Sequence, residues 1–309
     1  MAYSLKTEVQ KPERFEGGHR LCAGCGAGIT VRAVLRALEP EDKAVITNAT
    51  GCLEVSSFLY PYTAWNDSYI HSAFENAAAT CSGVEAAYNA LSRRGKIDEK
   101  FKFITFGGDG GTYDIGFQSL SGAMERGHDM VYVCYDNEAY MNTGIQRSSS
   151  TPRFASATTS PVGKVTQGKQ QNKKDLTDIL VSHNIPYVAQ TTFLGNFSDL
   201  HNKAKKAIYT EGPCFLNVMS PCPRGWGYET SNIAEICRLA VDTCIWPMYE
   251  VENGEWKLTY EPKKKLPVEE FLSKQDRFRH MFKPENQWMI EDAQNYVDIK
   301  WEKLLAKCK

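Results

Sequence analysis

The chain has 309 residues, of which 42% are hydrophobic and 24% are charged, and its formal net charge at pH 7 is −1. This composition is typical of a folded protein with one large domain or two, and the near-zero charge argues against nucleic acid or an anionic membrane surface as a partner. The N-terminal segment lacks the apolar core of a signal peptide, and no apolar run approaches the roughly 20 residues of a membrane span. We therefore expect a cytoplasmic protein.

Helical and strand patterns alternate along most of the chain. The expected elements are a helix at 27–38, a strand at 44–51, a helix at 74–95, a strand at 102–111, a helix at 112–127, a strand at 129–137, a helix at 175–184, a strand at 187–192, a helix at 197–210 and a strand at 214–222. Strands separated by helices of this length predict an α/β fold, a doubly wound parallel sheet with helices on both faces.

The alternation ends after Trp226. A hairpin at 248–262 and helices at 268–282 and 288–307 are expected beyond it. We predict an α/β domain over 1–228 and an extension over 229–309 that packs on the core or on a partner subunit. The polar stretch 142–174 has almost no apolar periodicity, and structureless loops of this length are usually functional or disordered.

A glycine-rich turn is expected where the strand at 102–111 meets its helix. The turn reads Gly107-Gly108-Asp109-Gly110-Gly111, and glycines at a helix start let backbone N–H groups approach a diphosphate. Asp109 would repel phosphate unless a cation such as Mg²⁺ lay between them. Asn137 follows Asp109 by 28 residues and ends the next strand, so the pair predicts a magnesium–diphosphate site. Two ordinary strand–helix turns are the alternative interpretation.

Two of the ten cysteines, Cys22 and Cys25, form a CxxC pair among small residues. A disulfide framework is not expected in a reducing compartment. Cys52 and Cys222 both follow predicted strands and could lie near the glycine-rich turn. Four thiolates suit zinc or an iron–sulfur cluster, and chemistry alone places zinc first. Cys81 and Cys134 lie in apolar patterns and are expected in the core.

A longer comparison of motifs identifies a family. The run GGDGGTYDIGFQSLSGAMERGHDMVYVCYDNEAYMNTGIQRSSSTP, together with HRLCAGCGAGITVRAVLRAL, TGCLEVSSFLYPYTAWNDSYIHSAFENAAAT, SPCPRGW and VEEFLSKQDRFRHMF, resembles the β subunit of the pyruvate:ferredoxin oxidoreductase family. These segments cover most of residues 19–282. The resemblance implies a thiamine diphosphate site with Mg²⁺ and a nearby [4Fe–4S] cluster. For the four cysteines, it therefore favours an iron–sulfur cluster over the zinc ion that chemistry alone places first.

The resemblance also implies roles for single residues. The ligands of the cluster would be Cys22, Cys25, Cys52 and Cys222. The ligands of Mg²⁺ would be the side chains of Asp109 and Asn137 and the backbone carbonyl of Ala139. The residues lining the cofactor would be Gly108, Gly110, Gly111 and Cys52, and Asn142 would act at the substrate end of the thiazolium. Cys214 is the rival fourth cysteine, and Cys237, Cys244 and Cys308 match no role. Glu54, His71 and Glu75 lie in family-like segments, where structural roles fit them equally well.

The implied activity is the oxidative decarboxylation of a 2-oxoacid, with electrons passing through the cluster to ferredoxin and coenzyme A taking the acyl group. Pyruvate is the first expectation, and branched-chain 2-oxoacids or oxalate, the latter without coenzyme A, are alternatives. The chain has no second α/β domain for the aminopyrimidine and no ferredoxin-like cysteine run. It should therefore work with α, γ and δ subunits or fusions of them. The rival interpretations are a non-redox thiamine diphosphate enzyme and a scaffold subunit, each with a zinc site.

Overall fold

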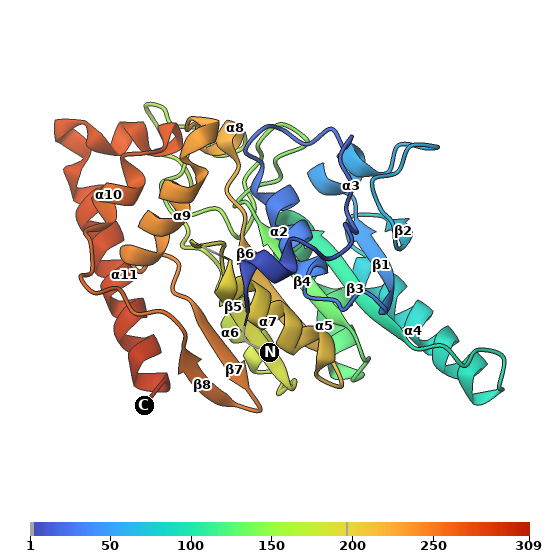
Figure 1. The fold of residues 1–309 in the computed structure, drawn as a ribbon. Helices are drawn as coiled ribbons and strands as arrows, with labels where there is room; N and C mark the ends of the chain where they lie inside the picture. The colour runs from blue at the N-terminus through green and yellow to red at the C-terminus, as the bar shows by residue number, and fades with distance from the viewer. Residues whose placement is uncertain (1–2, 196) are drawn as a thin grey trace.

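The computed structural model describes residues 3–195 and 197–309. Its centre is one eight-stranded sheet with the order β2-β1-β3-β4-β6-β5-β7-β8 (Figure 1). The strands are β1 (Lys43–Ala49), β2 (Ser68–Ser72), β3 (Phe101–Gly108), β4 (Val131–Asp136), β5 (Tyr187–Thr191), β6 (Cys214–Met219), β7 (Tyr249–Glu252) and β8 (Glu255–Leu258). The pairs from β2 to β5 are parallel, and β7 and β8 add an antiparallel hairpin at one edge.

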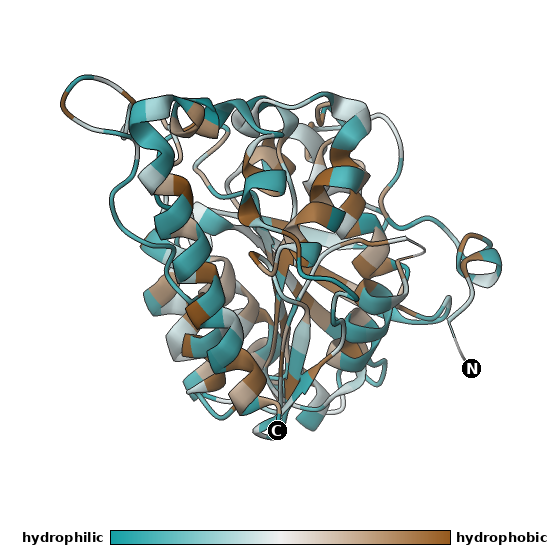
Figure 2. Ribbon diagram, turned by 90° about the vertical axis from the view of Figure 1, so that its left-hand side faces the viewer, coloured by the Kyte–Doolittle hydropathy of each residue, from teal (hydrophilic) through white to brown (hydrophobic). Residues whose placement is uncertain are grey.

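Helices cover both faces of the sheet (Figure 2). The helical elements are α1 (Leu5–Glu8), α2 (Gly26–Leu35), α3 (Cys52–Ser57), α4 (Ala77–Arg93), the π-helix η1 (Gly110–Ile115), α5 (Phe117–Glu125), α6 (Leu176–Val181), α7 (Ser198–Tyr209), α8 (Pro223–Trp226), η2 (Thr230–Asn232), α9 (Ile233–Asp242), α10 (Val268–Leu272), η3 (Asp276–Phe282), η4 (Pro284–Asn286) and α11 (Gln287–Lys307). Helices α2 and α7 contribute to the hydrophobic core on one face, and α4 and α5 contribute to the core on the other. This arrangement confirms the predicted doubly wound α/β class.

Strand β4 shows why the sheet must be covered on both sides. All six of its residues are buried, and their side chains alternate between the two cores. Val133 and Tyr135 belong to the core that contains α2, whereas Tyr132 and Cys134 belong to the core that contains α4. A strand that is apolar on both faces is characteristic of parallel sheets.

Several elements were not anticipated from the sequence. The edge strand β2 was missed because its residues do not alternate cleanly between buried and exposed. Helix α9 was missed because it lies after Trp226, where the alternation of helices and strands was expected to end. The polar segment 142–174 forms no named helix or strand, yet it is ordered against the core and buries Ser148, Ser150 and Phe154. Some of the polar side chains of this segment are therefore buried in the protein interior.

The residues after 228 pack closely on the rest of the chain. Strand β7 pairs with β5, and the Asp276 N–H donates to the carbonyl of Gly227 at 3.1 Å. Arg277, from the same segment, is buried. The division into 1–228 and 229–309 stays a prediction. Within the part of the chain described, no helix combines the length and apolarity needed to cross a bilayer.

Gly26, the first residue of α2, holds this helix against the segment that follows β6. Its N–H donates to the Pro221 carbonyl at 3.1 Å, and a Cβ on Gly26 would lie 2.5 Å from the carbonyl carbon of Ser220. We expect Gly26→Ala to lower stability by about 1–3 kcal/mol, because overpacking forces the backbone apart. The measurement is the thermal unfolding midpoint of the purified protein in its native assembly.

The matched control is Gly83→Ala, in the middle of α4, where an added Cβ meets nothing within 4 Å. Alanine favours helix, so this variant should be neutral or slightly more stable. Equal losses in both variants would contradict the proposed role of Gly26.

Candidate functional site

The predicted cofactor residues converge at the carboxyl ends of the parallel strands. One cavity is lined by Cys52, Gly108, Asp109, Gly110, Gly111, Asn137, Ala139 and Asn142, together with Thr50, Gly51, Phe74, Tyr135, Tyr140, Met141 and Thr143. The pairing of β3 with β4 sets Gly108 opposite Tyr135, so the two turns beyond these strands lie side by side. Ligands of open α/β sheets bind at this edge.

The three residues predicted to hold Mg²⁺ bring polar atoms to one point. One terminal atom of the Asn137 amide lies 2.8 Å from the Ala139 carbonyl oxygen and 2.9 Å from Oδ1 of Asp109. An amide nitrogen there would donate two hydrogen bonds, whereas an amide oxygen would face two other oxygens. Neighbouring oxygens of a Mg²⁺ octahedron are about 2.9 Å apart, given Mg–O distances of about 2.0–2.1 Å. The structure places the amide oxygen of Asn137 at this point, and the three residues present therefore fit Mg²⁺.

Asp109 is fully buried, with an exposed fraction of 0%. Its Oδ2 accepts a hydrogen bond from Ser148 Oγ at 2.5 Å, and its Oδ1 accepts one from the Asn137 N–H at 3.3 Å. Burial and the nearby carboxylate of Asp136 raise the pKa of Asp109 well above its usual value. A buried carboxylate in this state is poised to gain from a cation.

Glu138, which lies between Asn137 and Ala139 in the chain, has an unusual backbone conformation. Its φ is +65°, in the left-handed region that non-glycine residues rarely adopt. Its buried carboxylate binds Lys173 at 3.0 Å and Arg277 at 2.6 Å. Burial tends to raise the pKa of Glu138, but Lys173 and Arg277 outweigh it and hold this pKa below its usual value. These ion pairs secure the strained turn that presents Asn137 and Ala139.

The turn glycines are needed for packing as well as for ligand access. A Cβ on Gly111 would lie 2.9 Å from the Phe74 carbonyl oxygen, and one on Gly108 would lie 3.2 Å from the ring of Tyr135. Tyr140 covers Gly110 and donates to its carbonyl at 2.9 Å. Part of the glycine pattern therefore has a structural cause.

The four predicted cluster cysteines differ from most of the others in exposure. Cys22 is exposed and Cys25, Cys52 and Cys222 are partly exposed, while Cys81, Cys134, Cys214, Cys237 and Cys244 are buried and Cys308 is partly exposed. Cys214, the rival fourth ligand, lies at the start of the buried strand β6. Among the described residues, no group of three or more His, Cys, Asp or Glu side chains could hold a single metal ion.

Three of these cysteines stand at helix starts. Cys25 is the N-cap of α2, Cys52 is the first residue of α3, and Cys222 is the N-cap of α8. Cys222 Sγ accepts from the Gly225 N–H at 3.3 Å. Burial raises the pKa of Cys25 and of Cys222, and the backbone N–H groups at these helix starts oppose that rise by stabilising the thiolate.

The cysteines share one electrostatic environment. The pKa of Cys52 is raised to about 12, chiefly by burial and then by the charges of Cys222, Cys25, Cys22 and Asp109. Cys52 therefore interacts both with the other three cysteines and with Asp109 of the glycine-rich turn.

Glu54, His71 and Glu75, the three residues from family-like segments, differ in how far they are buried. Glu54 is buried and lies 3.5 Å from His71, whose Nε2 is 3.1 Å from Thr50 Oγ1. Burial raises the pKa of Glu54. Glu75 is exposed. Thr50 lines the cavity, so Glu54 and His71 form a polar group at its margin.

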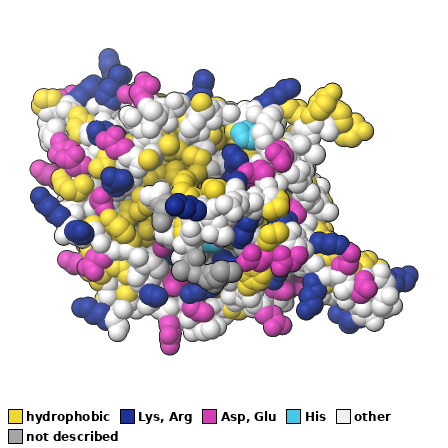
Figure 3. Space-filling model, in the orientation of Figure 1, with side chains coloured by type: hydrophobic (Ala, Val, Ile, Leu, Met, Phe, Trp, Pro, Cys, Tyr) yellow, Lys and Arg dark blue, Asp and Glu magenta, His cyan; other side chains and the backbone are white. Residues whose placement is uncertain are grey.

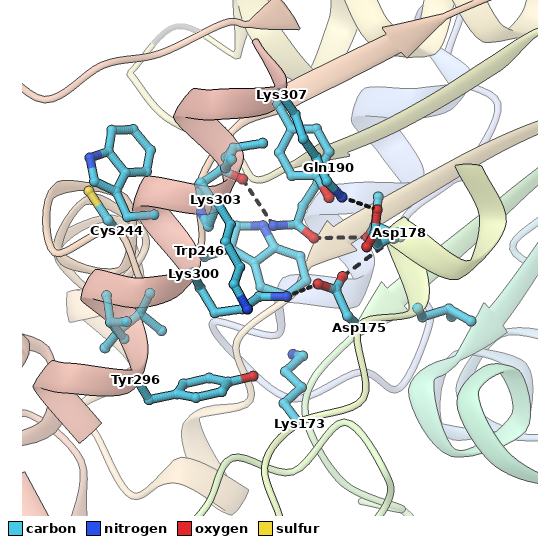
Figure 4. A pocket seen from close by; sticks show the side chains of 18 of the residues that line it. Lys173, Asp175, Asp178, Gln190, Cys244, Trp246, Tyr296, Lys300, Lys303 and Lys307 are labelled. Carbon is cyan, nitrogen blue, oxygen red and sulfur yellow. Dashed lines mark hydrogen bonds and ion pairs between the residues drawn. The ribbon is translucent and has the colours of Figure 1, made fainter. Parts of the chain in front are cut away.

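A larger cavity, of about 430 Å³, lies on the other side of Lys173, among α6, β5, β7, β8 and α11 (Figure 4). Its lysines pair with carboxylates: Lys300 with Asp175 and Lys307 with Asp178. Lys173 itself binds Asp136 at 2.8 Å. This cavity is larger than the one at the strand ends, but the predicted cofactor residues line the smaller one.

Sequence reasoning missed the residues that hold the site in place. They are Tyr135, Glu138, Ser148, Lys173 and Arg277. Glu138 lies inside the quoted DNEAY motif and could have been noticed, whereas Arg277 is 139 residues away from it along the chain. Only tertiary packing brings that cation to the site.

Comparison with known proteins agrees with the fold. The profile of the thiamine pyrophosphate enzyme C-terminal TPP binding domain matches residues 49–218. A solved structure of 2-oxoglutarate:ferredoxin oxidoreductase from Magnetococcus marinus, with 2-oxoglutarate, coenzyme A and succinyl-CoA bound, aligns with a TM-score of 0.56 over 72% of this chain and 68% of that chain. At 24% identity, this alignment supports the fold alone.

Curated relatives align over nearly the whole chain. Pyruvate synthase subunit PorB of Methanocaldococcus jannaschii is 54% identical over 295 residues, covering 95% of this chain and 97% of that protein. PorB of Thermotoga maritima is 53% identical over 314 residues, covering 99% and 97%. Ketoisovalerate oxidoreductase subunit VorB of Pyrococcus furiosus is 43% identical over 305 residues, covering 97% and 96%.

The fold, the glycine-rich turn and the matched profile define a thiamine pyrophosphate-binding domain. The chain belongs to the pyruvate synthase PorB family and is a subunit of a 2-oxoacid:ferredoxin oxidoreductase. The sequence-based recognition of the family is thus confirmed.

Removal of Arg277 tests the ion pairs that secure the turn at Glu138. We expect Arg277→Met to lower stability by about 3–5 kcal/mol, because it leaves a buried carboxylate without one of its two partners. Thermal unfolding of the purified assembly provides the measurement. Arg279→Met changes an exposed arginine of the same segment and serves as the control. A midpoint no lower than that of the control would contradict the role of Arg277.

Proposed function

We propose that this chain binds the diphosphate of thiamine diphosphate through Mg²⁺ and oxidatively decarboxylates pyruvate, with coenzyme A as the acyl acceptor and ferredoxin as the electron acceptor. The observation that carries the proposal is the convergence of Asn137, Ala139 and Asp109 at distances of 2.8 and 2.9 Å at the end of a parallel sheet. Such a site suits a hard cation that neutralises phosphate.

Each residue of the cavity has a distinct part in this proposal. The side chains of Asp109 and Asn137 and the carbonyl of Ala139 would hold Mg²⁺, and Gly108, Gly110 and Gly111 would leave room for the diphosphate. When bound, thiamine diphosphate supplies the electron sink that lets a 2-oxoacid lose carbon dioxide. Asn142 is exposed and lines the same cavity, which supports a role at the substrate end.

We further propose a [4Fe–4S] cluster on Cys22, Cys25, Cys52 and Cys222. Three observations support it: the partial exposure of the thiols, their shared electrostatic environment, and the backbone N–H groups directed at the sulfurs of Cys25 and Cys222. Hydrogen bonds of this kind stabilise cluster sulfurs. When bound, the cluster accepts single electrons beside the cofactor cavity, into which Cys52 also projects.

The family implies an assembly of several subunits, and we propose α, γ and δ partners or fusions of them. The loop after α3 projects from the molecule at the upper right of Figure 3, and it exposes 95% of Tyr60 and 84% of Tyr62. Large exposed aromatic side chains are enriched in protein interfaces. The loop follows α3, the six-residue helix that begins at Cys52, so a partner seated on it would lie within a short helix of the cofactor cavity.

Assay of the purified assembly tests the function. With pyruvate and coenzyme A, we expect reduction of ferredoxin or a viologen dye and formation of acetyl-CoA, and we expect lower kcat/KM with branched-chain 2-oxoacids and 2-oxoglutarate. An assembly carrying Asp109→Asn should retain at least tenfold less thiamine diphosphate after gel filtration, because it loses the carboxylate of the Mg²⁺ site.

The substrate panel separates the alternatives. A preference for 2-oxoisovalerate, or turnover of oxalate without coenzyme A, would replace pyruvate as the substrate. Full retention of thiamine diphosphate by the Asp109→Asn assembly would contradict the proposed metal site.

Metal analysis tests the cluster. We expect Cys222→Ala to remove about four irons and four acid-labile sulfides per copy of this chain from the assembly, since one of the four ligands is lost. Cys214→Ala, a change in the buried strand β6, should keep the wild-type content. One zinc per chain, lost with Cys222→Ala while iron is unchanged, would show a structural zinc site instead.

A further inference from the structure

Tyr135 has a buried hydroxyl group whose hydrogen finds no acceptor within the described chain. The residue is 1% exposed and its hydroxyl makes no hydrogen bond of ordinary geometry, although the Leu53 N–H lies on the acceptor side of its oxygen. Two other buried tyrosines nearby differ in this respect. Tyr113 donates to Asp136 at 2.8 Å, and the Tyr132 hydroxyl lies 3.0 Å from Thr112 Oγ1. A buried polar group without a partner costs free energy, so such a group in a cofactor cavity points to a missing acceptor.

The hydroxyl lies between the turns that carry the two proposed cofactor sites. A Cβ on Gly51 would lie 2.6 Å from the Tyr135 oxygen, and a Cβ on Gly108 would lie 3.2 Å from it. Gly51 directly precedes Cys52, and Gly108 directly precedes Asp109. Both glycines therefore make room for the phenol, and Tyr135 itself lines the cavity.

Of the two neighbouring turns, the one with Cys52 is closer to the hydroxyl. A Cβ on Gly51, which precedes Cys52, would lie 2.6 Å from the oxygen, against 3.2 Å for a Cβ on Gly108, which precedes Asp109. A phenol is a neutral O–H donor. Asp109 already accepts hydrogen bonds from Ser148 and Asn137.

We propose that the Tyr135 hydroxyl donates a hydrogen bond to a sulfur atom at the Cys52 corner of the bound cluster. This inference rests on the proposed function, because it requires the cluster. A hydrogen bond to sulfur stabilises the reduced cluster, which carries one more negative charge, and so raises its reduction potential. Tyr135 is thereby a positioning and tuning residue, and its ring keeps the Cys52 turn at a fixed distance from the Asp109 turn.

The test is Tyr135→Phe in the complete purified assembly, followed by a redox titration monitored by electron paramagnetic resonance. The signal of this chain's cluster is identified as the one that Cys222→Ala removes. At a fixed potential, the ratio of reduced to oxidised cluster should fall about three- to tenfold in Tyr135→Phe, where tenfold corresponds to about 59 mV for one electron. Thiamine diphosphate content should stay at the wild-type level.

Tyr132→Phe is the matched control. It removes a hydroxyl from the same strand, but that hydroxyl belongs to the opposite face of the sheet and is already bonded to Thr112. Its cluster should titrate as in the wild type. Thermal unfolding of both variants shows whether either change disturbs the fold.

The outcomes separate this inference from the proposed function. A wild-type potential in Tyr135→Phe, with the cluster present, overturns the hydrogen bond and leaves the function intact. An unchanged potential with weaker retention of thiamine diphosphate shows that the hydroxyl serves that cofactor instead, and it also overturns the inference. If the wild-type assembly carries no cluster signal sensitive to Cys222→Ala, the cluster assignment itself fails.

Discussion

The candidate site depends on the balance of charge at one buried edge of the sheet. Asp136, the last residue of β4, and Asp109 and Glu138, just beyond the ends of β3 and β4, place three carboxylates at this edge, and all three are almost fully buried. Lys173 and Arg277 neutralise two of these charges through ion pairs of 2.6 to 3.0 Å. One negative charge remains, on Asp109, and leaving it ionised without a partner is costly. A divalent cation resolves this imbalance and leaves positive charge to hold a diphosphate.

The residues that create this charge balance differ in whether the sequence could predict their position. The sheet, its helices and the positions of Asp109 and Asn137 follow from apolar periodicity and turn chemistry, which are local along the chain. Lys173 and Arg277 come from a polar loop and from the C-terminal extension, where charged residues are ordinarily solvated. Nothing in the local pattern distinguishes a lysine that will neutralise a buried carboxylate from one that will face water. Tyr135 was hidden for a related reason, because it lies inside an apolar strand and looks like a core residue.

The cysteines show how much the spacing of cysteines in a sequence can predict about a metal site. The CxxC pair was visible at once, but two of its possible partners, Cys214 and Cys222, are only eight residues apart. The structure separates them physically: Cys214 is buried in β6, and Cys222 caps α8 with a backbone N–H directed at its sulfur. A ligand must be accessible and its thiolate must be stabilised. Four cysteines can bind either zinc or an iron–sulfur cluster, and their spacing in the sequence does not determine which one is bound.

The edge that carries these groups is assembled from segments far apart in the chain. The N-terminal CxxC turn, the two strand-end turns, the polar loop, the segment after β6 and the extension each contribute at least one residue. Since no short segment contains the whole site, ligands recognise only the folded chain. Ligands that bind the native state alone stabilise it in proportion to the logarithm of their concentration relative to Kd. If they bind as proposed, Mg²⁺, thiamine diphosphate and the cluster would therefore act as structural components of this edge, offsetting the cost of collecting so many buried charges and thiols in one place.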